Sequence, residues 1–311
     1  MQIVKELAEL TPKQETMLTI GVFDGVHLGH QHLIKRLKQQ AAERGLLSGV
    51  LTFCGHPQEV LYPQMELTFL TSLEERVSLI QNLGVEFIAV LSFTPELAQL
   101  SAREFVSLLR EQLKMQGLVI GPDFALGRAR EGNATVLKAL GQELGFTVTS
   151  VPQLTVEGQL VSSTRIRETL SRGDIKQVAR LLGRHFTLSG VVVTGGERGR
   201  VLGFPTANIA PEPGRAVPAD GVYVTWAQVD SKLYRAVTNI GIRPTFGGGE
   251  RMIETYVLDF NGDLYGRTVA LQFIERVRGE IQFATPEELQ QQIGSDVERA
   301  RALLKQERGP N

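Results

Sequence analysis

The chain has 311 residues, of which 42% are hydrophobic and 22% charged, and its formal net charge is −1 at pH 7. This composition predicts a globular protein of two medium-sized domains. The near-neutral charge argues against a broad nucleic-acid surface, no apolar run reaches the ~18 residues of a membrane span, and the N-terminus lacks a signal-peptide pattern. The single cysteine, Cys54, excludes an intrachain disulfide, fits a reducing cytoplasm and is expected inside a buried strand.

The first half of the chain alternates strand-like and helix-like segments. The expected elements are strand 17–20, a helix from Leu33 to a stop at Gly45, strand 46–53, helix 73–83 behind a Ser72–Glu75 capping box, strand 85–93, helix 102–113 and a strand that begins at Leu118. Strand–helix alternation at this spacing predicts a doubly wound α/β domain with a parallel sheet.

After about residue 185 the pattern changes to short strands without intervening helices. Strands are expected at 189–193, 221–229, 233–240, 252–260 and 268–277, which indicates a small antiparallel β-barrel. Thr285 is expected to cap a closing helix that runs to about Lys305. Because the pattern changes after Gly183, we predict two domains, residues 1–184 and residues 185–311.

The segment GVFDGVHLGH joins the first strand to the first helix and places His27 and His30 close together beside three glycines. Four interpretations compete: a metal pair, core or capping histidines, a dinucleotide fingerprint, and a phosphate site. A metal pair lacks further ligands at helpful spacing, and the spacing of the glycines does not match the dinucleotide fingerprint. In a phosphate site the glycines let the backbone approach a triphosphate. The helix N-terminus and both imidazoles then offer hydrogen-bond donors.

His27-Leu28-Gly29-His30 is the HxGH signature of α/β nucleotidylyltransferases. The longer segment around it resembles the adenylyltransferase module of bacterial bifunctional riboflavin kinase/FAD synthetases. The resemblance implies that His27 and His30 stabilise the transition state as the phosphate of FMN attacks the α-phosphate of ATP and pyrophosphate leaves. It also implies nucleotide-binding residues around the two histidines, namely Gly21, Phe23, Gly25 and Gly29.

The segment GPDFALGRAREGN resembles the loop after a later strand of the same family. By this resemblance Asp123, Phe124 and Gly127 line the flavin and nucleotide pocket. Leu126 stands where the family usually has a second aromatic residue, so part of the packing there is expected to differ.

The segment SSTRIRETL resembles the nucleotide-closing motif of this family. From the residues alone it is a helix start with hydroxyls and cations for phosphates, or a plain cap with solvated arginines. The resemblance assigns Ser163, Thr164 and Arg167 to the nucleotide.

The segment GERGRVLGFPTANI carries a second candidate phosphate site. Gly199 and Gly203 suit a loop that folds over phosphates, and in an extended segment Thr206 and Asn208 would point to the same side and hold Mg2+. The alternative from these residues alone is a β-turn with a Thr or Asn cap. GRxLGFPTAN is the signature of riboflavin kinases, which implies nucleotide binding at the glycines and Mg2+ binding at Thr206 and Asn208.

The segment IETYVLDFNGDLYG resembles the catalytic stretch of the same kinases. By that match Glu254 is the general base that accepts the proton of the ribityl 5′-hydroxyl as it attacks the γ-phosphate of ATP. In an unrelated protein Glu254 would be a surface carboxylate on a strand edge. The segment NIGIRPTF resembles a loop that places Arg243 at the flavin.

Together the motifs imply an enzyme with two sequential activities. Riboflavin and ATP give FMN and ADP, then FMN and ATP give FAD and pyrophosphate, with Mg2+ as the divalent cation. The expected partners are these small molecules, with no nucleic acid and no membrane, and the expected state is a cytoplasmic monomer or weak homo-oligomer.

Two other hypotheses stay open from the sequence. In one, the HxGH domain uses a different acceptor, such as nicotinate mononucleotide or phosphopantetheine, and the barrel is regulatory. In the other, the chain is a flavin-sensing or nucleic-acid-binding protein with a degenerate site. The degenerate site is disfavoured because the residues expected to carry chemistry are all present: His27, His30, Thr206, Asn208 and Glu254.

Overall fold

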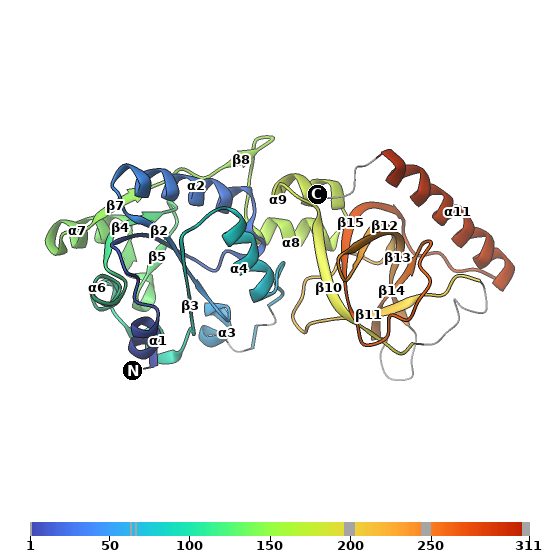
Figure 1. Ribbon diagram of the computed structural model, residues 1–311, viewed down its shortest axis with the longest axis horizontal. Coiled ribbons are helices and arrows are strands. Elements are labelled where there is room, and N and C mark those ends of the chain that lie inside the picture. The colour runs from blue at the N-terminus through green and yellow to red at the C-terminus, as the bar shows by residue number, and fades with distance from the viewer. Residues whose placement is uncertain (1, 63, 66, 196–202, 244–249, 307–311) are drawn as a thin grey trace. The chain divides into compact units, whose positions relative to one another are not determined.

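The computed structural model describes residues 2–62, 64–65, 67–195, 203–243 and 250–306. The chain divides into two compact units, Met1–Ser163 and Thr164–Asn311 (Figure 1). The two-domain organisation therefore has a structural counterpart, while the expected functional boundary after residue 184 stays a prediction.

The first unit is built on a five-stranded sheet in the order β3-β2-β1-β4-β7, and all its neighbouring strands are parallel (Figure 1). Its strands are β1 (Thr16–Ile20), β2 (Leu47–Phe53), β3 (Phe87–Leu91), β4 (Met115–Ile120) and β7 (Thr147–Ser150), with two antiparallel ribbons formed by β5 (Ala125–Leu126) with β6 (Gly132–Asn133) and β8 (Thr155–Val156) with β9 (Gln159–Leu160). Its helices are α1 (Gln2–Glu9), α2 (Leu28–Glu43), α3 (Pro57–Leu61), α4 (Leu73–Asn82), α5 (Pro95–Gln99), α6 (Ala102–Leu113) and α7 (Ala134–Leu144), with 3-10 turns η1 (Asp24–Val26) and η2 (Arg128–Arg130).

Helices cover both faces of this sheet, which confirms the doubly wound α/β class. Neighbouring residues of a strand point to opposite faces. Met17 accordingly packs in one core cluster with Ile34 of α2, while Leu18 packs in another cluster with Leu109 of α6. Strands buried on both faces need apolar residues at consecutive positions, and all five residues of β1 are buried.

The strand order reverses direction at β1. The chain runs from β1 outward to β2 and β3, then crosses back to form β4 on the other side of β1. In open α/β sheets such a reversal leaves a crevice at the carboxyl ends of the two central strands. The HxGH segment follows β1 and the segment 121–133 follows β4, so the topology brings these two motifs to one edge of the sheet.

Local signals in the sequence match the observed helix ends. Ser72 and Ser101 each accept a hydrogen bond from the backbone N–H three residues later, and both form complete capping boxes. The expectation for Cys54 was wrong, because β2 ends at Phe53 and the Cys54 side chain is exposed beyond the strand.

The second unit is a closed antiparallel barrel in the order β10-β11-β14-β13-β12-β15, in which β15 also pairs with β10 (Figure 1). This architecture confirms the expected small barrel. Its elements are α8 (Ser163–Ser171), α9 (Ile175–Leu182), β10 (Phe186–Val193), β11 (Ala207–Pro211), β12 (Gly221–Val229), β13 (Lys232–Arg243), β14 (Glu250–Val257), β15 (Thr268–Arg278) and α11 (Pro286–Gln306).

The closing helix packs on the outside of the barrel. Val297 and Ala300 of α11 share a core cluster with Val224 and Val237 of β12 and β13. The helix begins as expected, because Glu288 N–H donates to Thr285 Oγ1 at 3.2 Å. No helix in the described part of the chain is long and apolar enough to cross a membrane.

Candidate functional site

The corner between β1 and α2 has an unusual backbone. Gly21 N–H still donates to Leu51 O at 3.1 Å, as if it extended the sheet. The chain then turns through positive φ angles of 55° at Phe23, 78° at Gly25 and 39° at Val26. Left-handed conformations are strained for residues other than glycine and persist only where the surroundings enforce them. This corner is therefore held in place rather than relaxed.

His27 and His30 meet at the first turn of α2. His27 is the N-cap, and its Nδ1 accepts a hydrogen bond from His30 N–H at 3.2 Å. The two rings stack with centroids 3.6 Å apart and an interplanar angle of 16°. A Cβ atom at Gly29 would lie 3.1 Å from the His27 ring, so glycine makes room for this stack. The His30 ring also meets the Phe23 ring in an edge-to-face arrangement, with 5.1 Å between the centroids.

Burial lowers the pKa of His30 well below the ordinary value of 6.5 and so favours its neutral ring. Electrostatic interactions with His27 and Arg76 lower this pKa further. The His30 Nδ1 atom is buried and has no hydrogen-bond partner among the described residues. The corner thus holds a buried ring nitrogen that no described residue pairs with.

Two residues that the sequence analysis did not single out anchor this corner. Asp24 is 3% exposed, and its Oδ1 accepts hydrogen bonds from Leu70 N–H at 2.8 Å and Thr71 N–H at 3.2 Å. Arg76 is 2% exposed and donates to Val22 O. The position of Asp24 inside the HxGH segment could have suggested a role, whereas nothing in the sequence around Arg76 points to the corner.

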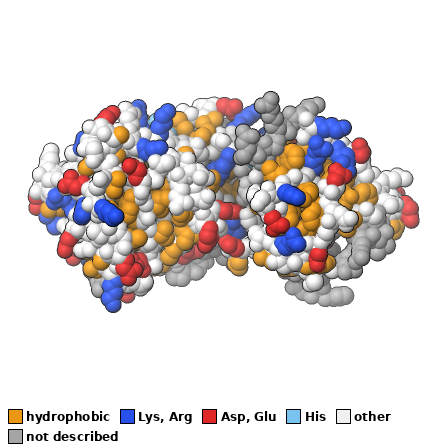
Figure 2. Space-filling model, in the orientation of Figure 1, with side chains coloured by type: hydrophobic (Ala, Val, Ile, Leu, Met, Phe, Trp, Pro, Cys, Tyr) orange, Lys and Arg blue, Asp and Glu red, His pale blue; other side chains and the backbone are white. Residues whose placement is uncertain are grey.

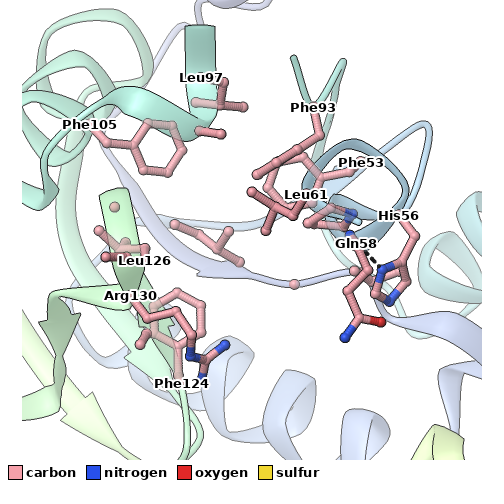
Figure 3. A pocket seen from close by; sticks show the side chains of 18 of the residues that line it. Phe53, His56, Gln58, Leu61, Phe93, Leu97, Phe105, Phe124, Leu126 and Arg130 are labelled. Carbon is pink, nitrogen blue, oxygen red and sulfur yellow. Dashed lines mark hydrogen bonds between the residues drawn. The ribbon is translucent and has the colours of Figure 1, made fainter. Parts of the chain in front are cut away.

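A cavity of about 640 Å³ lies beside the corner (Figure 3). Its size falls in the usual range for small-molecule sites, which are mostly apolar with a few polar groups. Figure 3 shows aromatic and aliphatic side chains around the space, with His56, Gln58 and Arg130 as polar groups. The apolar lining comprises Phe53, Leu61, Phe93, Leu97, Phe105, Phe124 and Leu126, among others. A flat aromatic ligand suits such a lining.

Asp123, Phe124 and Gly127 all line this cavity, and so does Gly21. The loop that carries them is fixed at Gly127, whose φ is +76° and whose Cβ, if present, would lie 2.5 Å from Ala102 N. The Asp123 carboxylate accepts a hydrogen bond from Gln153 Nε2. The structure therefore brings these predicted flavin residues to one pocket, while Phe23 lies in the core behind the histidines.

The segment SSTRIR forms the start of α8, as expected. Ser163 Oγ donates to Asp24 O at 2.9 Å and so ties this segment to the corner within the first unit. Thr164 and Arg167 belong to the second compact unit, where Arg167 Nη2 donates to Thr164 Oγ1 at 3.4 Å. Their assignment to the nucleotide stays a prediction.

The second candidate site lies on the barrel wall. Asn208 of β11 stands directly opposite Glu254 of β14, which in turn stands opposite Asn239 of β13. Opposed residues of antiparallel strands point to the same face. The three side chains therefore form a row across neighbouring strands, and the half-buried Thr206 precedes β11 at its entry to this row.

Asn208 has an unused oxygen. The residue is 6% exposed, and its Oδ1 is buried with no hydrogen-bond partner among the described residues. Gly195 packs against it so closely that a Cβ there would overlap the Asn208 amide. A buried amide oxygen without a partner destabilises the fold unless a bound ligand interacts with it. Amide and hydroxyl oxygens are suitable ligands for a hard cation such as Mg2+.

Some predicted residues can be placed only in part. Gly203 is described and has a φ of +83°, which favours glycine, whereas Gly199 lies outside the described residues. Arg243 is the last residue of β13, and the structure describes its backbone position only. No cluster of three or more His, Cys, Asp or Glu suited to a metal occurs within the described ranges.

Comparison with known families gives two matches that divide the chain. The family model for FAD synthetase matches residues 10–165, and the model for riboflavin kinase matches residues 182–304. The first match lies largely within Met1–Ser163, and the second lies within Thr164–Asn311.

Similar proteins span the whole chain. The bifunctional riboflavin kinase/FMN adenylyltransferase of Pseudomonas fluorescens is 39% identical over 97% of this chain and 98% of its own length. The protein of the same name from Bacillus subtilis (strain 168) is 37% identical over 92% of each chain, and the one from Escherichia coli (strain K12) is 36% identical over 98% of each. A crystal structure described as a macrolide-efflux protein from Streptococcus pneumoniae is also similar, with a TM-score of 0.88 and 32% identity over 95% of this chain and 96% of that one.

Proposed function

This chain belongs to the family of bifunctional riboflavin kinase/FMN adenylyltransferases, and from that premise we propose which of its residues carry each reaction. The enzyme phosphorylates riboflavin with ATP to FMN and then adenylylates FMN with a second ATP to FAD. We assign adenylylation to the first unit and phosphorylation to the barrel, because the FAD synthetase match covers most of the first unit and the riboflavin kinase match lies within the second. We take residues 1–184 and 185–311 as the functional domains.

In adenylylation, a phosphate oxygen of FMN attacks the α-phosphorus of ATP, the bond to the bridging oxygen breaks and pyrophosphate leaves. The stacked imidazoles at the start of α2 carry our assignment of this step. His27 Nδ1 accepts a hydrogen bond, so the ring proton of neutral His27 is on Nε2, which becomes its donor. Together with His30 and the helix N-terminus, it stabilises the negative charge that develops on the α-phosphate.

The glycines of the corner let the ATP phosphates approach the backbone. We propose Gly21, Gly25 and Gly29 for this contact, with Phe23 behind them and the flavin ring in the cavity lined by Phe124. Five further assignments rest on the resemblance: Asp123 and Gly127 for the flavin, and Ser163, Thr164 and Arg167 for the nucleotide.

In phosphorylation, the ribityl 5′-hydroxyl of riboflavin attacks the γ-phosphorus of ATP, and ADP leaves. Glu254 is the proposed general base, and its place beside Asn208 puts a carboxylate next to the proposed metal ligand. Thr206 and Asn208 would hold Mg2+, which would supply positive charge for the phosphates. The buried, unpartnered Oδ1 of Asn208 fits that role. Gly199, Gly203 and Arg243 are proposed from the resemblance, the glycines for ATP and the arginine for the flavin.

We propose that small molecules are the only partners of this enzyme and that it works in the cytoplasm as a monomer or weak homo-oligomer. Lys and Arg side chains on the face shown in Figure 2 are interspersed with Asp and Glu, a distribution that does not favour nucleic acid.

The direct test is a time course with riboflavin, ATP and Mg2+, in which flavins are separated by chromatography. We expect FMN to appear first and FAD to follow. FMN without FAD would contradict the assignment of the HxGH corner. FAD formed only from added FMN would contradict the assignment of the barrel site.

A further inference from the structure

A buried arginine lies behind the HxGH corner. Arg76, on the first turn of α4, is 2% exposed. Burial of a guanidinium costs several kcal/mol unless its hydrogen bonds and charge are compensated. The Arg76 Nε atom is nevertheless buried without a hydrogen-bond partner in the part of the chain that the structure describes. An apolar side chain would fill this place at less cost if packing alone were required.

The hydrogen bonds of Arg76 converge on one carbonyl group. Arg76 Nη1 donates to Val22 O at 2.6 Å and also lies 3.5 Å from Thr52 Oγ1. The Thr52 hydroxyl itself donates to Val22 O at 3.0 Å. Both lone pairs of this carbonyl are therefore occupied by side chains from α4 and β2.

Val22 immediately precedes the strained part of the corner. The next residues include Phe23 and Val26, whose positive φ angles an ordinary residue does not adopt without support. On the far side of Phe23, the Asp24 carboxylate is fixed by Thr71 N–H, from the segment that leads into α4. The same part of the chain thus holds the corner on both sides of its first left-handed residue.

Arg76 also acts on the corner through its charge. Burial lowers the pKa of Arg76 from its ordinary value, and the nearby Asp24 carboxylate opposes this effect by favouring the charged guanidinium. The pKa of His30 is lowered mainly by burial, then by His27, and the charge of Arg76 adds to this effect. Arg76 thus brings a cation from a separate helix that disfavours protonation of the His30 ring.

We propose that Arg76 is a positioning residue for adenylyl transfer, whose guanidinium fixes the Val22 carbonyl and thereby the left-handed corner that presents His27 and His30 to ATP. This inference rests on the proposed role of the two histidines. It extends that role to a residue that lies on another helix and does not reach the substrate.

The test compares Arg76→Met and Arg76→Lys with the unchanged enzyme. A slightly misplaced catalytic group loses about 100-fold in rate, so we expect Arg76→Met to lower the rate of FMN adenylylation about 10- to 100-fold. Riboflavin phosphorylation should stay within about 2-fold, because Arg76 lies outside the barrel unit. Arg103→Met is the matched control, since Arg103 is an exposed arginine of the same unit paired with Glu143.

A pH profile separates positioning from a merely structural role. Without the nearby cation, His30 binds a proton at higher pH, so the acid limb of the adenylylation profile should move upward in Arg76→Met. Arg76→Lys keeps the charge and should keep the limb near its original place while the rate falls.

If Arg76→Met does not fold, Thr52→Val is the alternative variant, because it removes the other hydrogen-bond donor to Val22 O with little change in side-chain volume. A lower adenylylation rate in Thr52→Val with unchanged thermal unfolding supports the proposal. An unchanged adenylylation rate and pH profile in folded Arg76→Met would overturn the proposal. An unchanged adenylylation rate in Thr52→Val would also overturn it. His27→Ala is measured alongside: if it keeps adenylylation, the proposed role of the histidines fails, whatever Arg76 does.

Discussion

At the scale of single residues, the two histidines of the corner are held in different ways. His27 has its Nδ1 occupied by a backbone N–H, which fixes its neutral tautomer. His30 is oriented by ring contacts with His27 and Phe23 instead. The sequence could predict that both lie at a helix start. It could not predict the stack, because the ring orientations depend on the left-handed turn before them.

The depressed pKa of His30 predicts a pH-dependent stability. Folding favours the neutral His30 ring. The contribution of His30 to the free energy of unfolding is therefore complete above its unfolded-state pKa of about 6.5, and it is lost as the pH falls toward the lower pKa of the folded state. The free energy of unfolding of the first unit should then fall below pH 6.5 by at most about 1.4 kcal/mol per pH unit. The free energy of unfolding, measured with urea at pH 7.5, 6.5 and 5.5, should change less steeply with pH in His30→Gln than in the unchanged chain. His32→Gln is the control, and parallel slopes for His30→Gln and the unchanged chain would contradict the prediction.

The unpartnered oxygen of Asn208 predicts a metal effect confined to the kinase reaction. Asn208→Ala should raise the Mg2+ concentration for half-maximal phosphorylation of riboflavin about 10- to 100-fold, the range seen when the support of a metal site is removed. The Mg2+ requirement of FMN adenylylation should not change. Asn261→Ala, at an exposed asparagine of the same unit, is the control. An unaltered Mg2+ titration for Asn208→Ala would rule out its role as a ligand.

At the scale of elements, α11 is held to the barrel by packing and by one largely buried ion pair. Arg278 Nη2 of β15 lies 2.8 Å from Asp296 Oδ2, and the two side chains are 17% and 4% exposed. Arg278 Nε also donates to the same carboxylate, at 3.1 Å. This pair fixes how the helix meets the barrel at the end of the last strand.

Removal of one partner should therefore destabilise the second unit. Asp296→Ala leaves a mostly buried cation, so we expect a loss of about 2–3 kcal/mol, less than for a fully buried pair because Arg278 keeps some contact with solvent. Thermal inactivation of the kinase reaction should occur at lower temperature, with adenylylation unaffected. The control is Arg267→Gln, in an exposed pair with Asp230, where less than about 1 kcal/mol is expected. Equal inactivation temperatures for Asp296→Ala and the control would show that the pair does not anchor the helix.

How well an element could be predicted follows from how much of it is buried and how it is capped. Helix α6 was predicted at its observed bounds because it has a capping box and a continuous apolar face. Helix α1 was missed, since it buries only Ile3 and Leu7. Strand β7 was missed because TVTS is a polar strand at the edge of the sheet, where it pairs with β4. Short or half-exposed elements depend on tertiary contacts that no local pattern records.

The same limit applies to the sites. Motif residues such as Asp123 and Phe124 could be expected at one pocket because β1 and β4 are neighbours at the reversal of the sheet. Much of the rest of the cavity wall comes from residues such as Phe53 and Phe93, whose hydrophobic character alone predicts only a core. Arg76 had no signal either, because its partner Val22 is reached only through the fold.

At the scale of the whole molecule, two folds of different class each carry one candidate site. The parallel sheet holds a helix N-terminus and an aromatic cavity, which suit a nucleotide and a flavin. The barrel holds the row that contains Asn208 and Glu254. We propose that these are separate active sites that act in sequence on one flavin.

The most direct measurement uses Glu254→Gln and His27→Ala, each supplied with riboflavin, ATP and Mg2+ and analysed for FMN and FAD. We predict that Glu254→Gln forms neither product from riboflavin yet converts added FMN to FAD. We predict that His27→Ala accumulates FMN and makes FAD about 100-fold more slowly or worse, as when a preorganised donor is removed. A folded variant of either kind that lost both reactions to the same extent would contradict the two-site account.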